Sequence, residues 1–245
     1  MDFAFASVVA HSPAVLVVDI GGSRVKLFAS RSRNTASFKS GNELGPDALM
    51  RSVKRLSDTW EYDVVSLGYP GATGPGGVVA DPGNLGAGWV GFDFAAAFGR
   101  PVRVVNDAAM QALGAYEGGR MLFLGLGTGL GSTIVGERVL IPLELGCLRH
   151  SSGDTLGVLL GKEGLARLGE DAWRHAVHET CAQLRLACGA DYIVLGGGNA
   201  ALVDPLPPDT RRGGNEDAFT GGVRLWQEWM EHHDTPPSDI WRVVW

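Results

Sequence analysis

The sequence has few cysteines, no excess of positive charge and no long apolar run, and each shortage excludes a class of protein. Its three cysteines among 245 residues are an odd set without CxxC spacing, so they predict neither a disulfide framework nor a zinc knuckle. The net charge of −6, without a basic block, argues against a nucleic-acid or membrane partner. No apolar stretch approaches the roughly 18 residues that span a bilayer, and residues 1–12 lack a secretory signal. We therefore expect a cytoplasmic protein.

Glycine, by contrast, is abundant. The 36 glycines make up about 15% of the chain against a usual ~7%, and they are interleaved with apolar runs rather than repeated in a collagen period. Glycines clustered at strand ends mark turns with positive φ or places where the backbone approaches a ligand closely. The chain is also long enough for one large core or two small ones joined across a cleft. We expect two compact lobes.

Runs of β-branched residues alternate with helical periodicity, which predicts an α/β fold. Strands are expected at residues 14–19, 25–29, 63–68, 102–105, 121–124 and 192–195. Helices are expected at residues 46–59, from Asn106-Asp107 to about residue 116, as one or two helices within 161–188, and at 216–231. Residues 71–91 form a long Gly- and Pro-rich loop of the kind that is functional or disordered, and 205–215 an irregular loop.

A hairpin with a glycine turn occurs near residue 20, and a second one near residue 128. Such a repeat predicts two related lobes that face each other across a cleft. We place the N-terminal lobe at residues 1–108 and the C-terminal lobe at 109–245, with the last helix free to pack back on the first lobe.

The first glycine turn lies in DIGGSRVK, residues 19–26. Asp19 ends a strand, and the backbone N–H groups of Gly21, Gly22 and Ser23 are suited to cradle a phosphate, with Lys26 nearby. Asp19 would then sit near a metal ion. An ordinary hairpin turn is the alternative explanation of an isolated glycine pair.

The second turn lies in GLGTGLGS, residues 125–132, where Gly127, Thr128 and Gly129 are again suited to phosphoryl oxygens. It is not a Walker A loop, because no GK[ST] follows, nor a Rossmann fingerprint, because a strand follows where a helix should. LGGGN, residues 195–199, could let a base or ribose lie against Gly197 and Gly198. A turn or helix entry explains that segment equally well.

Asn106-Asp107 lies where a strand meets a helix, so helix capping is the simple explanation. The pair also stands between the two glycine turns, where phosphoryl transfer to a hydroxyl needs a carboxylate that accepts the proton. Asp107 is the candidate base. Glu144 stands among apolar residues; if buried, it needs donors such as sugar hydroxyls, and otherwise it is a surface carboxylate.

Seven segments, in this order over residues 14–200, resemble the ROK family of sugar kinases: DIGGSRVK, Pro70-Gly71, NLGAGW, VVNDAAMQALGAY, LGLGTGLGS, ELG and IVLGGGN. Within that family the chain is most similar to the short polyphosphate/ATP glucokinases. The resemblance implies an α/β, two-lobed actin/hexokinase-like (ribonuclease H-like) fold with the active site in the interlobe cleft. It also implies transfer of a phosphoryl group from ATP or polyphosphate to a hexose hydroxyl, the 6-OH of glucose.

The resemblance implies a role for each matched residue. Asp107 would be the general base, and Asp19 would act near Mg²⁺ through water. Asn84, Asn106 and Glu144, with the turn at Gly71, would hold the sugar. The glycine turns would bind phosphates, and residues 196–198 would lie near the adenosine if ATP is the donor.

The sequence departs from the family pattern in two places, one at the predicted sugar site and one at the family's zinc site. Cys147 stands where the family's ELGH motif has a histidine, so one expected polar contact to the sugar is missing or displaced. His150 is the candidate to make that contact instead. The family's cysteine-rich zinc segment is absent from residues 149–162, so we expect no structural zinc.

Two other functions stay open beside the kinase. The first is a sugar- or nucleotide-binding protein that kept the fold and lost efficient catalysis, which Cys147 motivates. The second is a ROK-type transcription regulator, which is disfavoured because only 13 residues precede the first expected strand, too few for a DNA-reading helix pair. A homodimer is an open alternative for the assembly.

Overall fold

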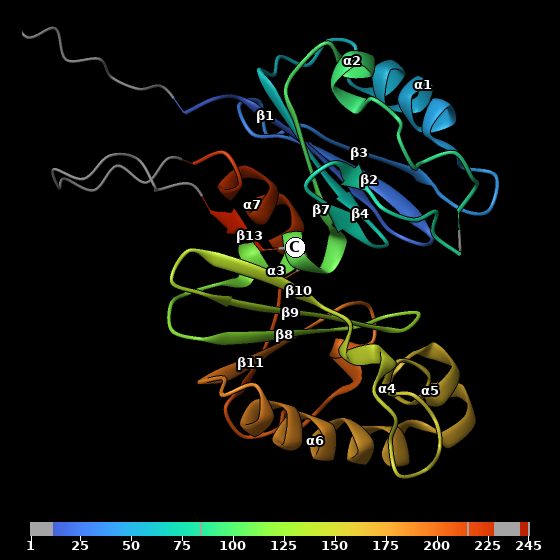
Figure 1. Cartoon of the computed structure of the whole chain (residues 1–245), viewed down its shortest axis with the longest axis vertical. Coiled ribbons are helices and arrows are strands. Elements are labelled where there is room, and N and C mark those ends of the chain that lie inside the picture. Colours follow the sequence, from blue (N-terminus) through green and yellow to red (C-terminus); the bar gives the residue numbers. More distant parts are fainter. Residues whose placement is uncertain (1–11, 84, 215, 228–240, 245) are drawn as a thin grey trace, which may run out of the picture.

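The computed structural model describes residues 12–83, 85–214, 216–227 and 241–244 (Figure 1). The first of two large sheets has the strand order β3-β2-β1-β4-β7. β2 runs antiparallel to its neighbours β1 and β3, whereas β4 and β7 run parallel to β1. Its strands are β1 (Val15–Ile20), β2 (Arg24–Ala29), β3 (Thr35–Lys39), β4 (Val64–Tyr69) and β7 (Val102–Asn106). A short hairpin, β5 (Thr73–Gly74) and β6 (Gly77–Val78), forms a two-stranded sheet of its own next to β7.

The second sheet repeats this order. Its strands β10-β9-β8-β11-β12 correspond to β3-β2-β1-β4-β7, and β13 adds to the free edge of β10. The strands are β8 (Met121–Leu126), β9 (Leu130–Gly136), β10 (Val139–Leu143), β11 (Tyr192–Gly196), β12 (Thr210–Arg212) and β13 (Arg242–Val243). The repeated hairpin pattern expected from the two glycine turns is therefore present, while the lobe boundary at 108/109 stays a prediction.

The helices and the sheets form alternating layers. α1 (Pro46–Leu56) and α2 (Phe94–Phe98) cover the outer face of the first sheet, and α3 (Asp107–Ala115) and α7 (Asp217–Arg224) lie between the two sheets (Figure 1). The outer face of the second sheet packs on α4 (Leu156–Leu160), α5 (Lys162–Leu168) and α6 (Glu170–Ala187). Two short 3₁₀ turns are η1 (Leu145–Cys147) and η2 (Ala200–Leu202).

Strand β1 shows how the sequence produces these layers. Its side chains alternate between the faces of the sheet, and all six are buried. Val15 and Val17 join the core around α3, whereas Leu16 and Val18 join the core beneath α1. A run that is apolar on both faces is typical of a strand covered on both sides.

Most expected elements are present, but some findings differ from the prediction. The short elements β5, β6, α4 and β13 were not expected. β3 and α2 were also not expected, and β12 lies within the expected loop at 205–215, because its polar residues carry no strand pattern and it forms by pairing with β11. The helix expected at 216–231 ends at Arg224, because Trp226 turns back to the first sheet and donates its Nε1–H to Ser66 Oγ. Residues 228–231 lie outside the described part. No described helix combines the length and apolarity that a bilayer crossing requires.

Candidate active site

The predicted site residues Asp19 and Asp107 lie at one edge of the first sheet. β1, β4 and β7 are parallel, so their carboxyl ends meet there. Asp19 is level with Gly68, and Gly68 is level with Val105, two residues before Asp107. Asp107 is the first residue of α3. The strand register therefore brings together two carboxylates that are far apart in the sequence.

Gly68 allows α3 to begin so close to β4. A Cβ at this position would lie 2.4 Å from Met110 Cε and 3.5 Å from Asp107 Cα. The Met110 methyl group ends a flexible side chain and can move aside, and Asp107 Cα is at ordinary contact distance, so it is a side chain longer than that of alanine that would crowd the first turn of α3. This glycine was part of an expected strand, but its contact with Met110 could not be foreseen from the sequence.

Asn106 fixes the start of α3 and the neighbouring loop. Its Oδ1 accepts a hydrogen bond from Ala109 N at 3.1 Å, which caps the helix, and its Nδ2 donates to Gly71 O at 3.1 Å. Helix capping, the simple explanation of Asn106, is therefore what its Oδ1 does. A sugar contact would have to use what remains of the amide's hydrogen-bonding capacity.

Asp107 has the electrostatic properties of a base that works near neutral pH. Burial, then the charge of Asp19 and more weakly that of Glu144, raise the pKa of the Asp107 carboxyl to about 7. A hydrogen bond from Ala108 N to its Oδ1, at 2.8 Å, acts in the opposite direction. The side chain is nevertheless partly accessible to solvent. A carboxyl with a pKa close to the working pH is suited to general-base catalysis.

Asp19 is the more deeply buried carboxyl, at 5% exposure. Burial raises its pKa to about 6, and Lys26, whose Nζ lies 4.0 Å from Asp19 Oδ2, partly opposes this. Its Oδ1 has no hydrogen-bond partner among the described residues. A buried, unpartnered carboxylate oxygen fits a cation or its bound water, so the residue present is compatible with Mg²⁺. The described residues contain no cluster of three or more acidic, His or Cys side chains that could hold a metal ion alone. Mg²⁺ here would therefore take other ligands from water and substrate phosphates.

The first glycine turn is short, and it is held by one hydrogen bond within the turn and one from Ser40. Gly21 N donates to Arg24 O at 3.0 Å, and Ser40 Oγ donates to Gly21 O at 2.6 Å. Gly22 and Ser23 are exposed at its tip. A rigid turn with exposed backbone at the end of β1 is compatible with a phosphate contact.

The second glycine turn contacts the LGGGN segment directly. A Cβ at Gly197, whose φ is +79°, would lie 2.5 Å from Leu126 O, and Asn199 N donates to that same oxygen at 3.0 Å. By contrast, a Cβ at Gly198 would meet no atom within 4 Å. Thr128 is exposed at the tip of the turn. The structure therefore places these two predicted segments side by side.

The second hairpin also meets α3 next to Asp107. A Cβ at Gly131 of β9 would lie 2.8 Å from Ala108 Cβ. Only a glycine lets the second sheet come this close to the residue that follows Asp107. Elements from both sheets therefore converge on the start of α3.

Ser132 makes hydrogen bonds beside Glu144 that the sequence did not reveal. Its Oγ donates to Leu143 O at 2.8 Å and accepts from Leu145 N at 3.1 Å, which holds the backbone on both sides of Glu144. Glu144 is exposed, which agrees with the surface-carboxylate alternative, and its charge contributes to the raised pKa of Asp107. Cys147, also exposed, donates its backbone N–H to Glu144 O at 3.0 Å. The two residues thus belong to one 3₁₀ turn.

His150 belongs to a separate turn. Its Nδ1 lies 3.0 Å from Ser152 Oγ, and its backbone N–H donates to Asp154 O at 2.8 Å. Its part in sugar binding stays a prediction.

Asn84 lies outside the described residues, but the loop around it is anchored by Asp81. Asp81 Oδ1 accepts from Trp89 N at 2.8 Å, and Oδ2 accepts from Gly88 N at 3.2 Å. These backbone N–H bonds hold the pKa of Asp81 below its usual value. The Trp89 ring is fully buried, 5.4 Å from that of Tyr69. The sequence predicted a functional loop here but gave no indication of Asp81, the aspartate that anchors it.

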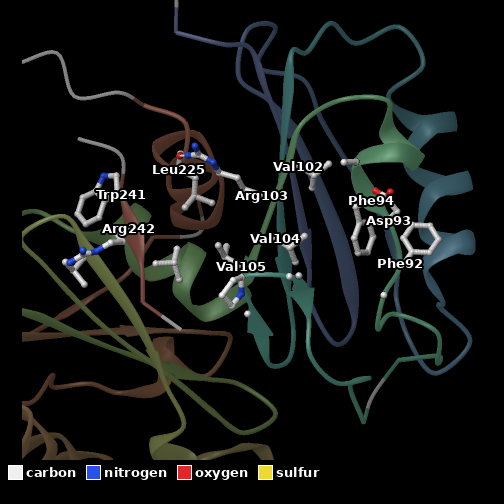
Figure 2. Close-up of a pocket in the computed structure, with 18 of the residues that line it drawn as sticks. Phe92, Asp93, Phe94, Val102, Arg103, Val104, Val105, Leu225, Trp241 and Arg242 are labelled. Carbon is white, nitrogen blue, oxygen red and sulfur yellow. Dashed lines mark hydrogen bonds between the residues drawn. The ribbon is translucent and has the colours of Figure 1, made fainter. Parts of the chain in front are cut away.

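A cavity of about 1260 Å³ lies elsewhere, between β7 and the tail of the chain (Figure 2). β7 residues and Phe94 line one side, and Leu225 and Trp241 line the other. None of the predicted site residues lines it. The size of this cavity alone does not make it the active site. The two carboxyls with raised pKa values, Asp19 and Asp107, indicate that the edge of the first sheet is the better candidate.

Comparison with known proteins places the fold. No protein-family model matches the sequence, and no curated protein matches it. Among solved structures, the inorganic polyphosphate/ATP-glucomannokinase from Arthrobacter sp. strain KM matches at a TM-score of 0.73 and 23% identity, over 87% of this chain and 97% of that chain. A ROK family glucokinase from Streptomyces griseus, in complex with glucose and AMPPNP, matches at 0.65 and 18% identity, over 87% and 99%. The chain has the actin/hexokinase-like fold of the ROK sugar kinases.

The expected fold class is therefore confirmed. The same fold also occurs in a ROK family transcriptional regulator, which matches at a TM-score of 0.63 and 14% identity, over 86% of this chain and 77% of that chain. Identities this low show the fold and leave the activity to be argued from the site.

Proposed function

We propose that the chain is a sugar kinase that transfers a terminal phosphoryl group from ATP or polyphosphate to a hexose hydroxyl, the 6-OH of glucose. The observation that supports this most strongly is the position of Asp107. It stands at the start of α3, where both hairpins meet, and its pKa is raised to about 7 beside Asp19. The fold is shared with proteins described as sugar kinases, one of them solved with glucose.

In the proposed reaction Asp107 accepts the proton of the sugar hydroxyl. Ala108 N holds Oδ1, which leaves Oδ2 to take that proton. The hydroxyl oxygen then forms a bond to the terminal phosphorus of the donor, and the bond from that phosphorus to the bridging oxygen breaks. The shortened donor leaves as the anion, and Asp107 later releases the proton to water. Glu144, Asn106 and the loop anchored by Asp81 would hold the other sugar hydroxyls.

Asp19 would hold Mg²⁺ through water, and bound Mg²⁺ would neutralise charge on the transferred phosphoryl group. The exposed backbone at Gly22, Ser23 and Thr128 would contact the phosphates. If ATP is the donor, the open space beside Gly198 would receive the adenosine. Lobe closure would exclude water, so that the phosphoryl group reaches the sugar rather than water.

A binding protein without efficient catalysis is the second candidate, and Cys147 favours it, because a thiol replaces the histidine that the family resemblance implies at the sugar. A screen of hexoses against ATP and polyphosphate tests the choice, with product detected as sugar phosphate. Phosphorylation of a hexose supports the kinase. Calorimetric binding of sugars without phosphorylation of any would overturn it in favour of a binding protein or regulator.

A further inference from the structure

Helices α3 and α7 touch through their backbones. A Cβ at Gly114 of α3 would lie 1.8 Å from Asp217 O, and a Cβ at Gly221 of α7 would lie 1.8 Å from Met110 O. Real Cβ contacts are never this short, so any larger residue at either position would force the helices apart. The crossing therefore sets the distance between the two helices with no side chain between them.

α7 also holds the carboxyl end of α3. Arg224 Nη1 donates to Leu113 O at 2.8 Å, to Gly114 O at 3.1 Å and to Tyr116 O at 2.8 Å. Carbonyls at the end of a helix lack partners within the helix and carry partial negative charge, so a guanidinium is a favourable cap. α3 is thus held by α7 at its middle and at its end.

α7 in turn is fixed to the first sheet. Ser66 Oγ of β4 donates to Gly222 O at 2.6 Å and accepts from Trp226 Nε1 at 2.9 Å. The ring of Phe219 stacks on that of Phe28 at 5.0 Å. Arg103 of β7 points toward α7, where it donates to Leu225 O and lies 4.2 Å from the ring of Trp226 (Figure 2). The sheet that carries Asp19 therefore also carries α7.

We propose that Gly221 and Arg224 are positioning residues that aim Asp107 at the acceptor hydroxyl. β7 determines where α3 begins, and contacts further along the helix, above all those with α7, help to determine its direction. Asp107 is in the first turn of this short helix, so a tilt at the crossing moves its carboxylate relative to Asp19. Misplacement of a catalytic group by about 1 Å can cost ~10²-fold in rate. This inference rests on the proposed role of Asp107.

The test compares Arg224→Met with Arg224→Lys. Met keeps the apolar stem and removes every donor, whereas Lys retains a cation that can reach the carbonyls. We expect Arg224→Met to lower kcat about 10- to 100-fold, with the sugar KM and the calorimetric Kd nearly unchanged. Arg224→Lys should keep most of the wild-type kcat. Unchanged kcat in Arg224→Met, or equal losses in both variants, would overturn the proposal.

If Arg224→Met does not fold, substitutions at two neighbouring glycines of α7 provide a second test. Gly221→Ala places a methyl group against α3. The control is Gly222→Ala, whose Cβ would instead lie 2.5 Å from Val17 of β1. At comparable losses of Tm, the fall in kcat should be at least about tenfold greater for Gly221→Ala; equal falls would contradict the inference. Wild type and Asp107→Asn run alongside test the proposed function separately. An inactive wild type refutes that function, whereas an active wild type with unaffected α7 variants refutes only this inference.

Discussion

The two carboxyl groups at the sheet edge differ from ordinary surface carboxylates because burial raises both pKa values, to about 6 for Asp19 and about 7 for Asp107. A carboxyl whose pKa is raised by folding lowers the free energy of unfolding as the pH rises from its unfolded pKa to its folded pKa, and the full cost is present above the folded pKa. Below the unfolded value near 3.8 the same group has no such cost, because it is protonated in both states.

Asp19→Asn should therefore stabilise the protein in the absence of Mg²⁺, and more so at higher pH. We expect a gain of about 1–3 kcal/mol in the free energy of unfolding at pH 8, falling as the pH drops through 6 toward 4. Urea unfolding at pH 8 and pH 5 measures this. A gain that is the same at both pH values, or a loss at pH 8, would show that the Asp19 carboxyl does not carry this burial cost.

At the residue scale, Asp19 and Asp107, the two carboxylates that the sequence singled out, lie at the same sheet edge, while their roles stay predictions. The sequence could not identify residues that act through shape or backbone contacts. Gly68 and Gly131 matter because of atoms that approach them from distant segments, and Ser132 because it holds the backbone around Glu144. These contacts exist only after the sheets have formed.

At the scale of the elements, the loop around Asp81 can be tested by comparing two aspartate substitutions. Its carboxylate binds two backbone N–H groups, and removing it should loosen the loop that carries the predicted sugar residue Asn84. We expect Asp81→Ala to raise the KM for sugar about tenfold with little change in kcat.

Asp93→Ala is the matched control for Asp81→Ala. Asp93 follows the same loop, and its Oδ1 accepts from Ala96 N at 2.9 Å to cap α2. Its loss should lower Tm without changing the sugar KM. If both variants leave KM unchanged in steady-state assays, Asp81 does not organise the sugar site.

Periodicity predicted the long elements well, because α1, α6 and the buried strands have strong apolar patterns. It failed where a partner rather than the local sequence decides the structure. β12 becomes a strand because β11 offers its edge, and α7 ends at Arg224 because Trp226 bonds to Ser66. Both outcomes depend on residues far away in the chain.

For the whole molecule, the two glycine turns were sufficient to predict a repeated hairpin, and the two sheets do share one strand order. The sequence left open whether the last helix packs back on the first lobe. In the structure α7 lies between the sheets and contacts β1, β4 and α3. That position links the sheet that carries Asp19 to the helix that carries Asp107.

The central claim is that Asp107 accepts the proton during phosphoryl transfer to a sugar. The most direct test measures turnover of the wild type and of Asp107→Asn on the best hexose and donor, with Asp93→Asn as a control aspartate at another helix start. We predict that Asp107→Asn keeps its fold and sugar affinity while kcat falls by ~10²- to 10⁴-fold, and that Asp93→Asn stays near wild type. Near wild-type turnover in Asp107→Asn would contradict the claim.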